Sequence, residues 1–336
     1  MKIENLLELP FDMYQRYKDI QIIVKKLFGN KKVRILDVGG ENNLIRKFLP
    51  DVETYYINFR NESAPNFVRG DGVQLPFKDS VFDIVVTVDT LEHIKPKDRE
   101  QFINELIRAS KDYVIITAPF DNGLAPLVDR FLNEISIQFL KVEHPCIKEH
   151  IANGLPKIEE VTNILDKRKI EYISFSSGNI YNWLYMMTLK HYLFSIPNTE
   201  ELHKLLDGLY NINFYELDHS PPSYRQVFIL SKKGSNFEQV EKVFNENLPN
   251  KVKNDDILKF LNAMSVLSNI HVVNQLKEKE QQINLQQEHV VRLDGEIGQK
   301  DERIKDLEGE INKILQLKSI RLHRKIDEIL RRMRII

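Results

Sequence analysis

Short apolar runs alternate with amphipathic stretches along the first two thirds of the chain. Four runs are rich in β-branched or aromatic residues: 33–38, 54–57, 82–88 and 113–118. Near-continuous apolar runs of this length are typical of strands buried on both faces of a parallel sheet. Between the last two runs, Phe102, Leu106 and Ile107 share one face of a predicted helix over 96–110. The alternation predicts a doubly wound α/β fold, with helices on both faces of the sheet.

Helical segments flank this core on both sides. Residues 1–30 have apolar positions at helical spacing, and Gly29-Asn30 ends the pattern. After Pro119 the pattern predicts three helices and two strands: helices over 124–141, 158–169 and 181–193, and strands over 172–175 and 226–230. The last strand comes soon after Pro221-Pro222, which suits an edge or hairpin position, and we expect the sheet to end near Lys232.

Beyond Gly234 the pattern becomes that of one long helix. With Leu276 taken as an a position, every a position through Ile311 is apolar, whereas the d positions alternate between apolar and polar until Ile314. Such a repeat, surrounded by Glu, Lys and Gln, predicts an α-helical coiled coil over 273–317, after a helical linker over 234–272. Isoleucine at a with leucine at d favours a parallel dimer, and polar d positions leave a trimer open. The alternative is a long solvated helix packed back on the body.

Residues 318–336 form a basic tail. They include seven Lys or Arg residues and two acidic ones, although the whole chain has a net charge of −1. A mildly acidic body with a basic end indicates a separate partner for that end. Apolar positions lie beside arginines, as in a basic amphipathic helix on an anionic membrane surface: Ile326, Ile329, Leu330 and Met333. The alternatives are a frayed helix end and a binding site for another protein.

Composition excludes several classes of protein. The chain of 336 residues is 42% hydrophobic and 29% charged, as expected for a packed core. The single cysteine, Cys146, excludes an internal disulfide framework and a cysteine-cluster metal site. The acidic body and the lack of interleaved basic and aromatic residues argue against nucleic acid. No apolar run resembles a signal peptide or reaches the length of a membrane span, so we expect a cytoplasmic protein.

A glycine turn is the first candidate for chemistry. The run over 33–43 predicts a buried strand, a tight turn and a helix, with Asp37 near the end of the strand. Gly39 and Gly40 follow where the backbone must approach a ligand closely. The turn lacks the Gly-x-Gly-x-x-Gly of dinucleotide binders, because Glu41 and Asn43 stand where further glycines would be. A glutamate beside a pyrophosphate would be repulsive, so the turn argues against a dinucleotide.

A second segment lies at the spacing expected for the next strands of the same fold. It contains Gly-Asp at 70–71, Leu-Pro-Phe at 75–77, Phe-Asp at 82–83 and Leu-Glu-His-Ile at 91–94. After the Leu-Asp-Val-Gly-Gly run, this pattern resembles the class I S-adenosylmethionine-dependent methyltransferases, especially their small-molecule branch. The resemblance covers 33–232 and implies a Rossmann-like methyltransferase domain over 31–233. The cationic sulfonium of S-adenosylmethionine suits the carboxylates of this segment better than a pyrophosphate would.

The resemblance also implies the cofactor contacts. In these enzymes the glycine turn, here Gly39 and Gly40, holds the methionine part of the cofactor near the acid that corresponds to Asp37. The acid corresponding to Asp71, with its neighbour Gly72, lies at the adenine amino group. The stretch from Asp89 to His93 lies beneath the sulfonium and the acceptor.

Two positions depart from the family pattern. Asn58 stands where an acid normally grips both ribose hydroxyls, and asparagine lacks that bidentate, charge-assisted grip. Asn43 replaces the usual last glycine of the turn, although asparagine tolerates positive φ better than most residues. A degenerate, non-catalytic domain is therefore one alternative.

Histidines are the candidate general bases for a hydroxyl acceptor. His93, His144 and His150 follow predicted strands, and His219 is a further candidate by location. The alternative for each is a surface or helix-capping role. Glu143 and Glu149 beside two of them favour a pocket, while no spacing supports a zinc site, so we expect no metal. Trp183, at helical spacing with Leu184 and Met187, is predicted to be core.

Two further resemblances suggest a biological setting. The run over 143–156, with its His-Pro and Asn-Gly-Leu-Pro, is similar to methyltransferases associated with surface-polysaccharide glycosyltransferases. The Ser-Ile-Arg-Leu of 319–322 resembles tails that end coiled coils in polysaccharide-biosynthesis transferases. We expect O-methylation of a glycan, sugar or glycolipid precursor near the inner face of the membrane. The alternatives are a scaffold that recruits glycosyltransferases, and a methyltransferase for a quinone or another small metabolite.

Overall fold

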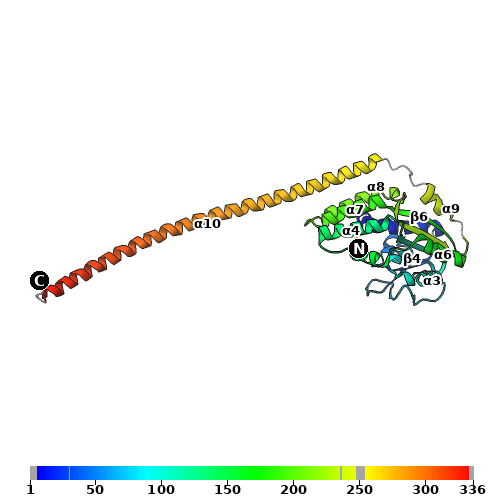
Figure 1. Ribbon diagram of the computed structural model, residues 1–336, viewed down its shortest axis with the longest axis horizontal. Helices are drawn as coiled ribbons and strands as arrows, with labels where there is room; N and C mark the ends of the chain where they lie inside the picture. Colours follow the sequence, from blue (N-terminus) through cyan, green and yellow to red (C-terminus); the bar gives the residue numbers. More distant parts are fainter. Residues whose placement is uncertain (1–5, 30, 235–236, 247–253, 333–336) are drawn as a thin grey trace. The chain divides into compact units, whose positions relative to one another are not determined.

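Seven strands form one mixed sheet in the order β3-β2-β1-β4-β5-β7-β6. Figure 1 labels β4 and β6 among the surrounding helices. Neighbouring strands from β3 to β5 run parallel, and β7 runs antiparallel to both β5 and β6. The computed structural model describes residues 6–29, 31–234, 237–246 and 254–332. The strands are β1 (Arg34–Val38), β2 (Glu53–Asn58), β3 (Phe67–Arg69), β4 (Phe82–Val88), β5 (Ser110–Pro119), β6 (Glu171–Asn179) and β7 (Ser223–Ser231).

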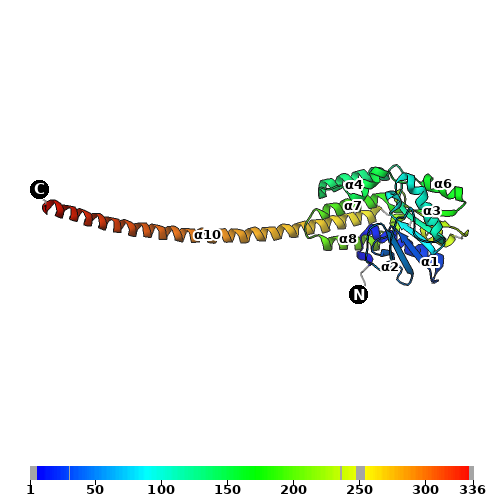
Figure 2. The same ribbon diagram turned by 90° about the horizontal axis from the view of Figure 1, so that it is seen from below.

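Helices cover both faces of the sheet, as the alternation predicts. Figure 2 shows α3 (Arg99–Ala109) and α6 (Ile158–Arg168) on one side, and α1 (Phe11–Phe28) and α2 (Leu44–Phe48) on the other. The central strand β4 contributes to both layers of core: Val85 packs with the α3 and α6 side chains, and Val86 packs with those of α1. Burial on both faces explains why the central strands are almost continuously apolar.

The remaining helices follow in chain order. They are η1 (Leu6–Glu8), η2 (Leu91–His93), η3 (Pro96–Asp98), α4 (Ala125–Leu140), α5 (Pro145–Asn153), α7 (Ile180–Phe194), α8 (Glu200–Asn213), η4 (Glu216–His219), α9 (Glu238–Glu241), the π-helical η5 (Lys242–Glu246) and α10 (Asn254–Arg332). Among the described residues, no helix combines the length and the apolar character needed to cross a membrane.

Most predicted elements are confirmed, and the prediction for the last strand is partly wrong. β7 is not at an edge of the sheet, because it pairs with β5 on one side and β6 on the other. Pro221 and Pro222 precede its first residue, Ser223, so they remove no hydrogen bond from the ladder. The helix predicted after the glycine turn is α2, whereas sequence patterns missed the short strand β3 and the helices α5 and α8.

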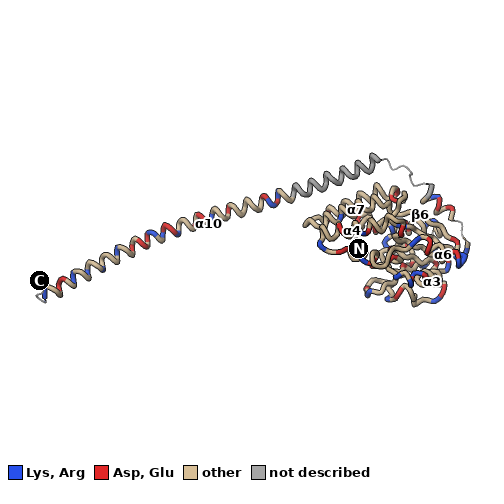
Figure 3. Tube along the Cα trace, in the orientation of Figure 1, with Lys and Arg blue, Asp and Glu red and all other residues tan. Residues whose placement is uncertain are grey.

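The chain divides into two units, Met1–Lys253 and Asn254–Ile336. The second unit is α10, one uninterrupted helix of 79 residues that crosses the predicted boundaries at 272 and 317. Its described a-position side chains are exposed, Leu276 by 61% and Ile297 by 56%. Figure 3 shows charges of both signs along the described part of this helix. Met333 and Arg334 of the predicted tail lie outside the described residues.

Candidate functional site

The carboxyl ends of β1, β2 and β4 bring the predicted site residues to one edge of the sheet. Asp37 of β1 is in register with Tyr56 of β2 and Val86 of β4. Asn58 ends β2, and Asp89 follows β4 directly. Ligands of open parallel sheets bind at this edge, at the point where the order of the strands in the sheet reverses.

The glycine turn after β1 is tightly enclosed. Gly39 has a φ of +86°, and a Cβ added there would lie 2.2 Å from the Thr90 hydroxyl oxygen. A Cβ on Gly40 would lie 2.5 Å from Oδ2 of Asp37. Asn43 adopts a φ of 50° at the start of α2, and its side chain accepts a hydrogen bond from Thr54 Oγ1 at 3.1 Å. The asparagine that departs from the family pattern is thus built into the turn.

Asp37 is fully buried behind this turn. Its Oδ2 accepts a hydrogen bond from the Tyr17 hydroxyl at 3.1 Å, while its buried Oδ1 has no partner among the described residues. Burial raises the pKa of Asp37 to about 7, although Tyr17 and Arg16 act in the opposite direction. A cationic ligand beside Oδ1 would favour the ionised carboxylate.

Asp89 is held between the buried Arg225 and the partly buried Arg16. Its Oδ2 lies 2.8 Å from Nη1 of Arg16 in α1 and 2.7 Å from Nη2 of Arg225 in β7, and the Arg225 Nε also donates to both carboxylate oxygens. Burial alone raises the pKa of Asp89, but the two arginines outweigh it and hold that pKa below its ordinary value. The carboxylate of Asp89, which was predicted to face the cofactor, is therefore neutralised by Arg16 and Arg225.

A stacked pair of aromatic rings lies beside the Arg225 guanidinium. Trp183 is buried as predicted, and its ring stacks on Tyr224 with centroids 3.8 Å apart. The Arg225 guanidinium lies 5.2 Å from the centroid of the Tyr224 ring. Patterns along the chain give no signal for Arg16, Tyr17 or Arg225, because each meets its partner across a long sequence separation.

The predicted ribose and adenine residues lie beside the same turn. The Asn58 amide donates to the carbonyl of Gly40 at 3.2 Å, and its Oδ1 accepts from the Arg60 backbone at 3.1 Å. Asn58 therefore fastens the turn to the end of β2. Asp71 is exposed and accepts from the Val73 backbone at 2.9 Å, and a Cβ on Gly72 would lie 2.5 Å from the Phe102 ring.

Two of the three predicted base histidines meet at the carboxyl end of β4. His93 in η2 and His150 in α5 have ring centroids 5.0 Å apart. The Nδ1 of His93 lies 2.6 Å from Glu149, and the Nδ1 of His150 lies 3.1 Å from Asp129. Glu92 lies between them, and burial raises its pKa well above the ordinary value, with Asp89 adding to the effect. Burial lowers the pKa of His93, and His150 lowers it further.

The other predicted histidines have structural contacts. His144 caps α5, because its Nδ1 accepts the Ile147 backbone N–H at 3.4 Å. The His-Pro pair could have revealed this, since proline favours the first helical position. His219 is buried against Asp19, with 2.8 Å between Nε2 and Oδ1.

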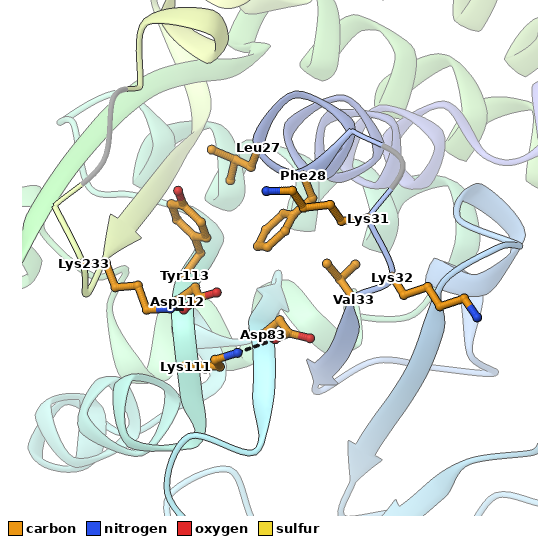
Figure 4. Close-up of a pocket in the computed structure, with 10 residues that line it drawn as sticks. All are labelled: Leu27, Phe28, Lys31, Lys32, Val33, Asp83, Lys111, Asp112, Tyr113 and Lys233. Atoms are coloured by element: carbon orange, nitrogen blue, oxygen red, sulfur yellow. Dashed lines mark ion pairs between the residues drawn. The ribbon is translucent and has the colours of Figure 1, made fainter.

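A separate pocket lies at the opposite, amino edge of the strands. Its volume is about 330 Å³, and it is lined by Leu27, Phe28, Lys31, Lys32, Val33, Asp83, Lys111, Asp112, Tyr113 and Lys233. Figure 4 shows Lys111 directed at Asp83 and Lys233 at Asp112. Because both of its aspartates are paired with lysines and it lies at the edge where parallel sheets do not bind ligands, this pocket is not the candidate site.

Part of the chain is similar in sequence to known proteins. Residues 48–116, from the end of α2 through most of β5, match the model of a family described as methyltransferase domain. Ajmaline N-methyltransferase from Rauvolfia serpentina is 34% identical over 83 residues, which are 22% of this chain and 28% of that protein. Fatty-acid O-methyltransferase from Mycolicibacterium smegmatis is 28% identical over 152 residues, 40% of this chain and 54% of that protein.

Solved structures give weaker similarities. The YcgJ protein of Bacillus subtilis aligns over 65% of this chain and 100% of its own, at 14% identity and a TM-score of 0.40. Magnesium protoporphyrin IX methyltransferase from Synechocystis aligns over 66% of this chain and 83% of its own, at 12% identity and a TM-score of 0.40.

The chain spans about half of the fatty-acid enzyme and less than a third of the alkaloid enzyme. The matched residues nevertheless include β2, β3 and β4, whose carboxyl ends carry Asn58, Asp71 and Asp89. Residues 48–116 are thus similar to a methyltransferase domain, and they lie within the mixed seven-stranded sheet.

Proposed function

We propose that this protein transfers a methyl group from S-adenosylmethionine to a hydroxyl of a glycan, sugar or glycolipid precursor in surface-polysaccharide biosynthesis. The observation that carries the methyl transfer is the buried carboxylate at the glycine turn. Asp37 is fully buried, its Oδ1 has no partner in the described part of the chain, and Gly39 and Gly40 adjoin it. An orphaned acceptor in such a place fits a ligand that carries a positive charge.

The cofactor fits the residues that the resemblance assigns to it. Asp37 and the glycine turn would hold its methionine part, and Asp71 with Gly72 would face its adenine. When bound, S-adenosylmethionine supplies an electrophilic methyl group. Asp89 does not contribute a net negative charge, because Arg16 and Arg225 neutralise it, so its role is to position the loop after β4.

The acceptor side is formed by Glu92, His93 and His150. Both histidines have a carboxylate at Nδ1, which fixes the ring and leaves Nε2 directed toward Glu92. A hydroxyl placed between them could lose its proton to this group of side chains. Because His144 caps a helix, we propose no proton transfer for it.

The acceptor class is supported by the resemblance of 143–156 to polysaccharide-associated methyltransferases. The relatives named above act, by their names, on an alkaloid and a fatty acid, which favours a small metabolite as the second candidate. Calorimetry with S-adenosylmethionine tests the common basis, and absence of binding would instead support a non-catalytic scaffold. Release of S-adenosylhomocysteine with glycan, quinone or fatty-acid acceptors then separates the two enzymatic functions.

We also propose that α10 pairs with a second copy of itself in a parallel coiled coil. Its a positions from Leu276 to Ile311 are apolar, and their side chains are exposed in the single chain. Light scattering should give a dimer, and Ile297→Asp with Ile304→Asp should shift it to monomer. Gln281→Asp, at an f position, should leave it a dimer; a wild-type monomer would contradict the proposal, and a trimer would correct its stoichiometry.

The basic end of α10 is proposed to bind the inner face of the membrane. Ile326 and Ile329 are exposed beside Arg331 and Arg332, which are the basic residues of the last described turn. Co-sedimentation with vesicles that contain anionic lipid should exceed that with neutral vesicles and should fall with salt. Equal recovery with both kinds of vesicle would exclude an electrostatic membrane contact.

A further inference from the structure

We propose that Glu92, His93 and His150 bind a divalent first-row transition-metal ion, which holds the acceptor through a hydroxyl oxygen. The inference rests on the proposed methyl transfer for its purpose, but not for the metal site itself. It differs from the expectation drawn from the sequence, where no metal spacing is evident, because the three residues come from two separate segments.

The three side chains converge on one small volume. Oε1 of Glu92 lies 3.9 Å from Nε2 of His93 and 4.0 Å from Nε2 of His150. One ligand atom from each residue lies within 4.8 Å of the other two. Two atoms bound to one ion at about 2.1 Å are separated by roughly 3–4 Å, so side-chain adjustments on the order of 1 Å would complete the site.

Carboxylates behind the histidines orient them as metal ligands. The Nδ1 of His93 is 2.6 Å from Glu149, and the Nδ1 of His150 is 3.1 Å from Asp129. Asp129 is itself fixed by the Tyr224 hydroxyl at 2.5 Å. Such a partner on one ring nitrogen leaves the other available, and it is the usual outer contact of a metal-bound histidine.

Buried polar atoms in the cluster lack the partners that they require. Oε2 of Glu92 and Nε2 of His150 are both buried and have no hydrogen-bond partner among the described residues. Their side chains are 1% and 7% exposed. The 4.0 Å between Nε2 of His150 and Oε1 of Glu92 is too long for a hydrogen bond, so Glu92 does not satisfy this nitrogen. A cation bound between Glu92 and His150 would supply the missing partner.

The donor set indicates the class of ion and of substrate. Two imidazoles and one carboxylate suit Zn²⁺, Fe²⁺ or Co²⁺ better than Mg²⁺ or Ca²⁺. Three protein ligands leave positions open, and His93, whose side chain is 26% exposed, gives access to them. With Nε2 of both histidines bound to the ion, they would act as ligands and not as bases, and a hydroxyl on the ion would lose its proton to solvent more readily. Its oxygen would form the new O–C bond while the C–S bond breaks, with the electron pair going to sulfur.

Cobalt provides a test that does not need the acceptor. The chelator-treated full chain should take up one equivalent of Co²⁺ with visible d–d bands. Glu92→Gln and His93→Asn should each lower the Co²⁺ affinity at least about 100-fold, because each removes a direct ligand. His93→Asn keeps a polar atom near the position of Nδ1 and removes Nε2, and its partial exposure favours correct folding.

His144→Asn is the matched control, since it makes the same substitution at a helix cap and should not change Co²⁺ uptake. The inference fails if the wild type shows no d–d bands, or if His93→Asn binds Co²⁺ as the wild type does. Calorimetry with S-adenosylmethionine on the metal-free chain reports on the proposed function separately. Cofactor binding without Co²⁺ uptake would overturn only the metal site, and Co²⁺ uptake without cofactor binding would overturn only the methyl transfer.

Discussion

The two edges of the sheet carry similar charged residues in different surroundings. At the carboxyl edge, the side chains of Asp89 and Arg225 are 13% and 4% exposed, and at the amino edge those of Asp83 and Lys111 are 26% and 52% exposed. Charges interact more strongly where water is excluded, and an uncompensated charge costs more there. The position of a charge in the sheet, rather than its type, therefore decides whether it shapes a site.

Removing the charge of Asp89 should have the largest effect on stability. Asp89→Asn leaves the buried Arg225 without its counter-charge and leaves Arg16 with Asp12 alone, which should lower the free energy of unfolding by about 3–5 kcal/mol. Asparagine is well suited to the backbone, because residue 89 has a φ of 49°. Urea unfolding measures the loss.

The matching change at the amino edge is Lys111→Met. Lys111 lies 3.5 Å from Asp83 in a partly exposed pair, so the loss should be below about 1 kcal/mol. Similar losses at both edges would show that burial does not distinguish them.

The pH dependence of stability should reveal Asp37. Its pKa is raised from 3.8 to about 7 in the folded chain, so the folded state binds more protons than the unfolded state between these values. Stability from this group is therefore present below pH 4 and is lost as the pH rises toward 7. Between pH 5 and 8 the ligand-free wild type should lose roughly 2–3 kcal/mol more than Asp37→Asn. Parallel curves would show that Asp37 is ionised throughout.

The glycine turn should tolerate no side chain at Gly40. Gly40→Ala places a Cβ 2.5 Å from Oδ2 of Asp37, which must move away from its contact with Tyr17. We expect the affinity for S-adenosylmethionine to fall at least about 10-fold, equal to about 1.4 kcal/mol. Gly208→Ala, in α8, is the control. The nearest contact of the added Cβ would be 3.6 Å away, so the affinity of this variant for S-adenosylmethionine should not change. Equal affinities for both variants would place the cofactor elsewhere.

The sequence predicted which strands build the site but not what completes it. Asp37, Asn58 and Asp89 could be placed at one edge because apolar runs and the parallel topology determine where each strand ends. Arg225 and Arg16 could not be placed, since they reach Asp89 from β7 and α1, and nothing local marks an arginine as buried. His144 and His150 looked equivalent along the chain, yet a turn of helix gives one a cap and the other a place beside Glu92.

Restoring the family's acid at position 58 should have the smallest effect, because two contributions oppose each other. Asn58→Asp would supply a carboxylate for ribose hydroxyls, with stronger charge-assisted hydrogen bonds. It would also lose the amide that donates to the Gly40 carbonyl at 3.2 Å, and would place a negative charge beside that oxygen. We expect calorimetry to show a change in cofactor affinity below about threefold. Asn58→Ala loses the hydrogen bond to the Gly40 carbonyl and the one from the Arg60 backbone, and it should weaken cofactor binding about 10-fold. If Asn58→Asp instead improved affinity more than 10-fold, the bond to Gly40 would not be what holds the turn in place.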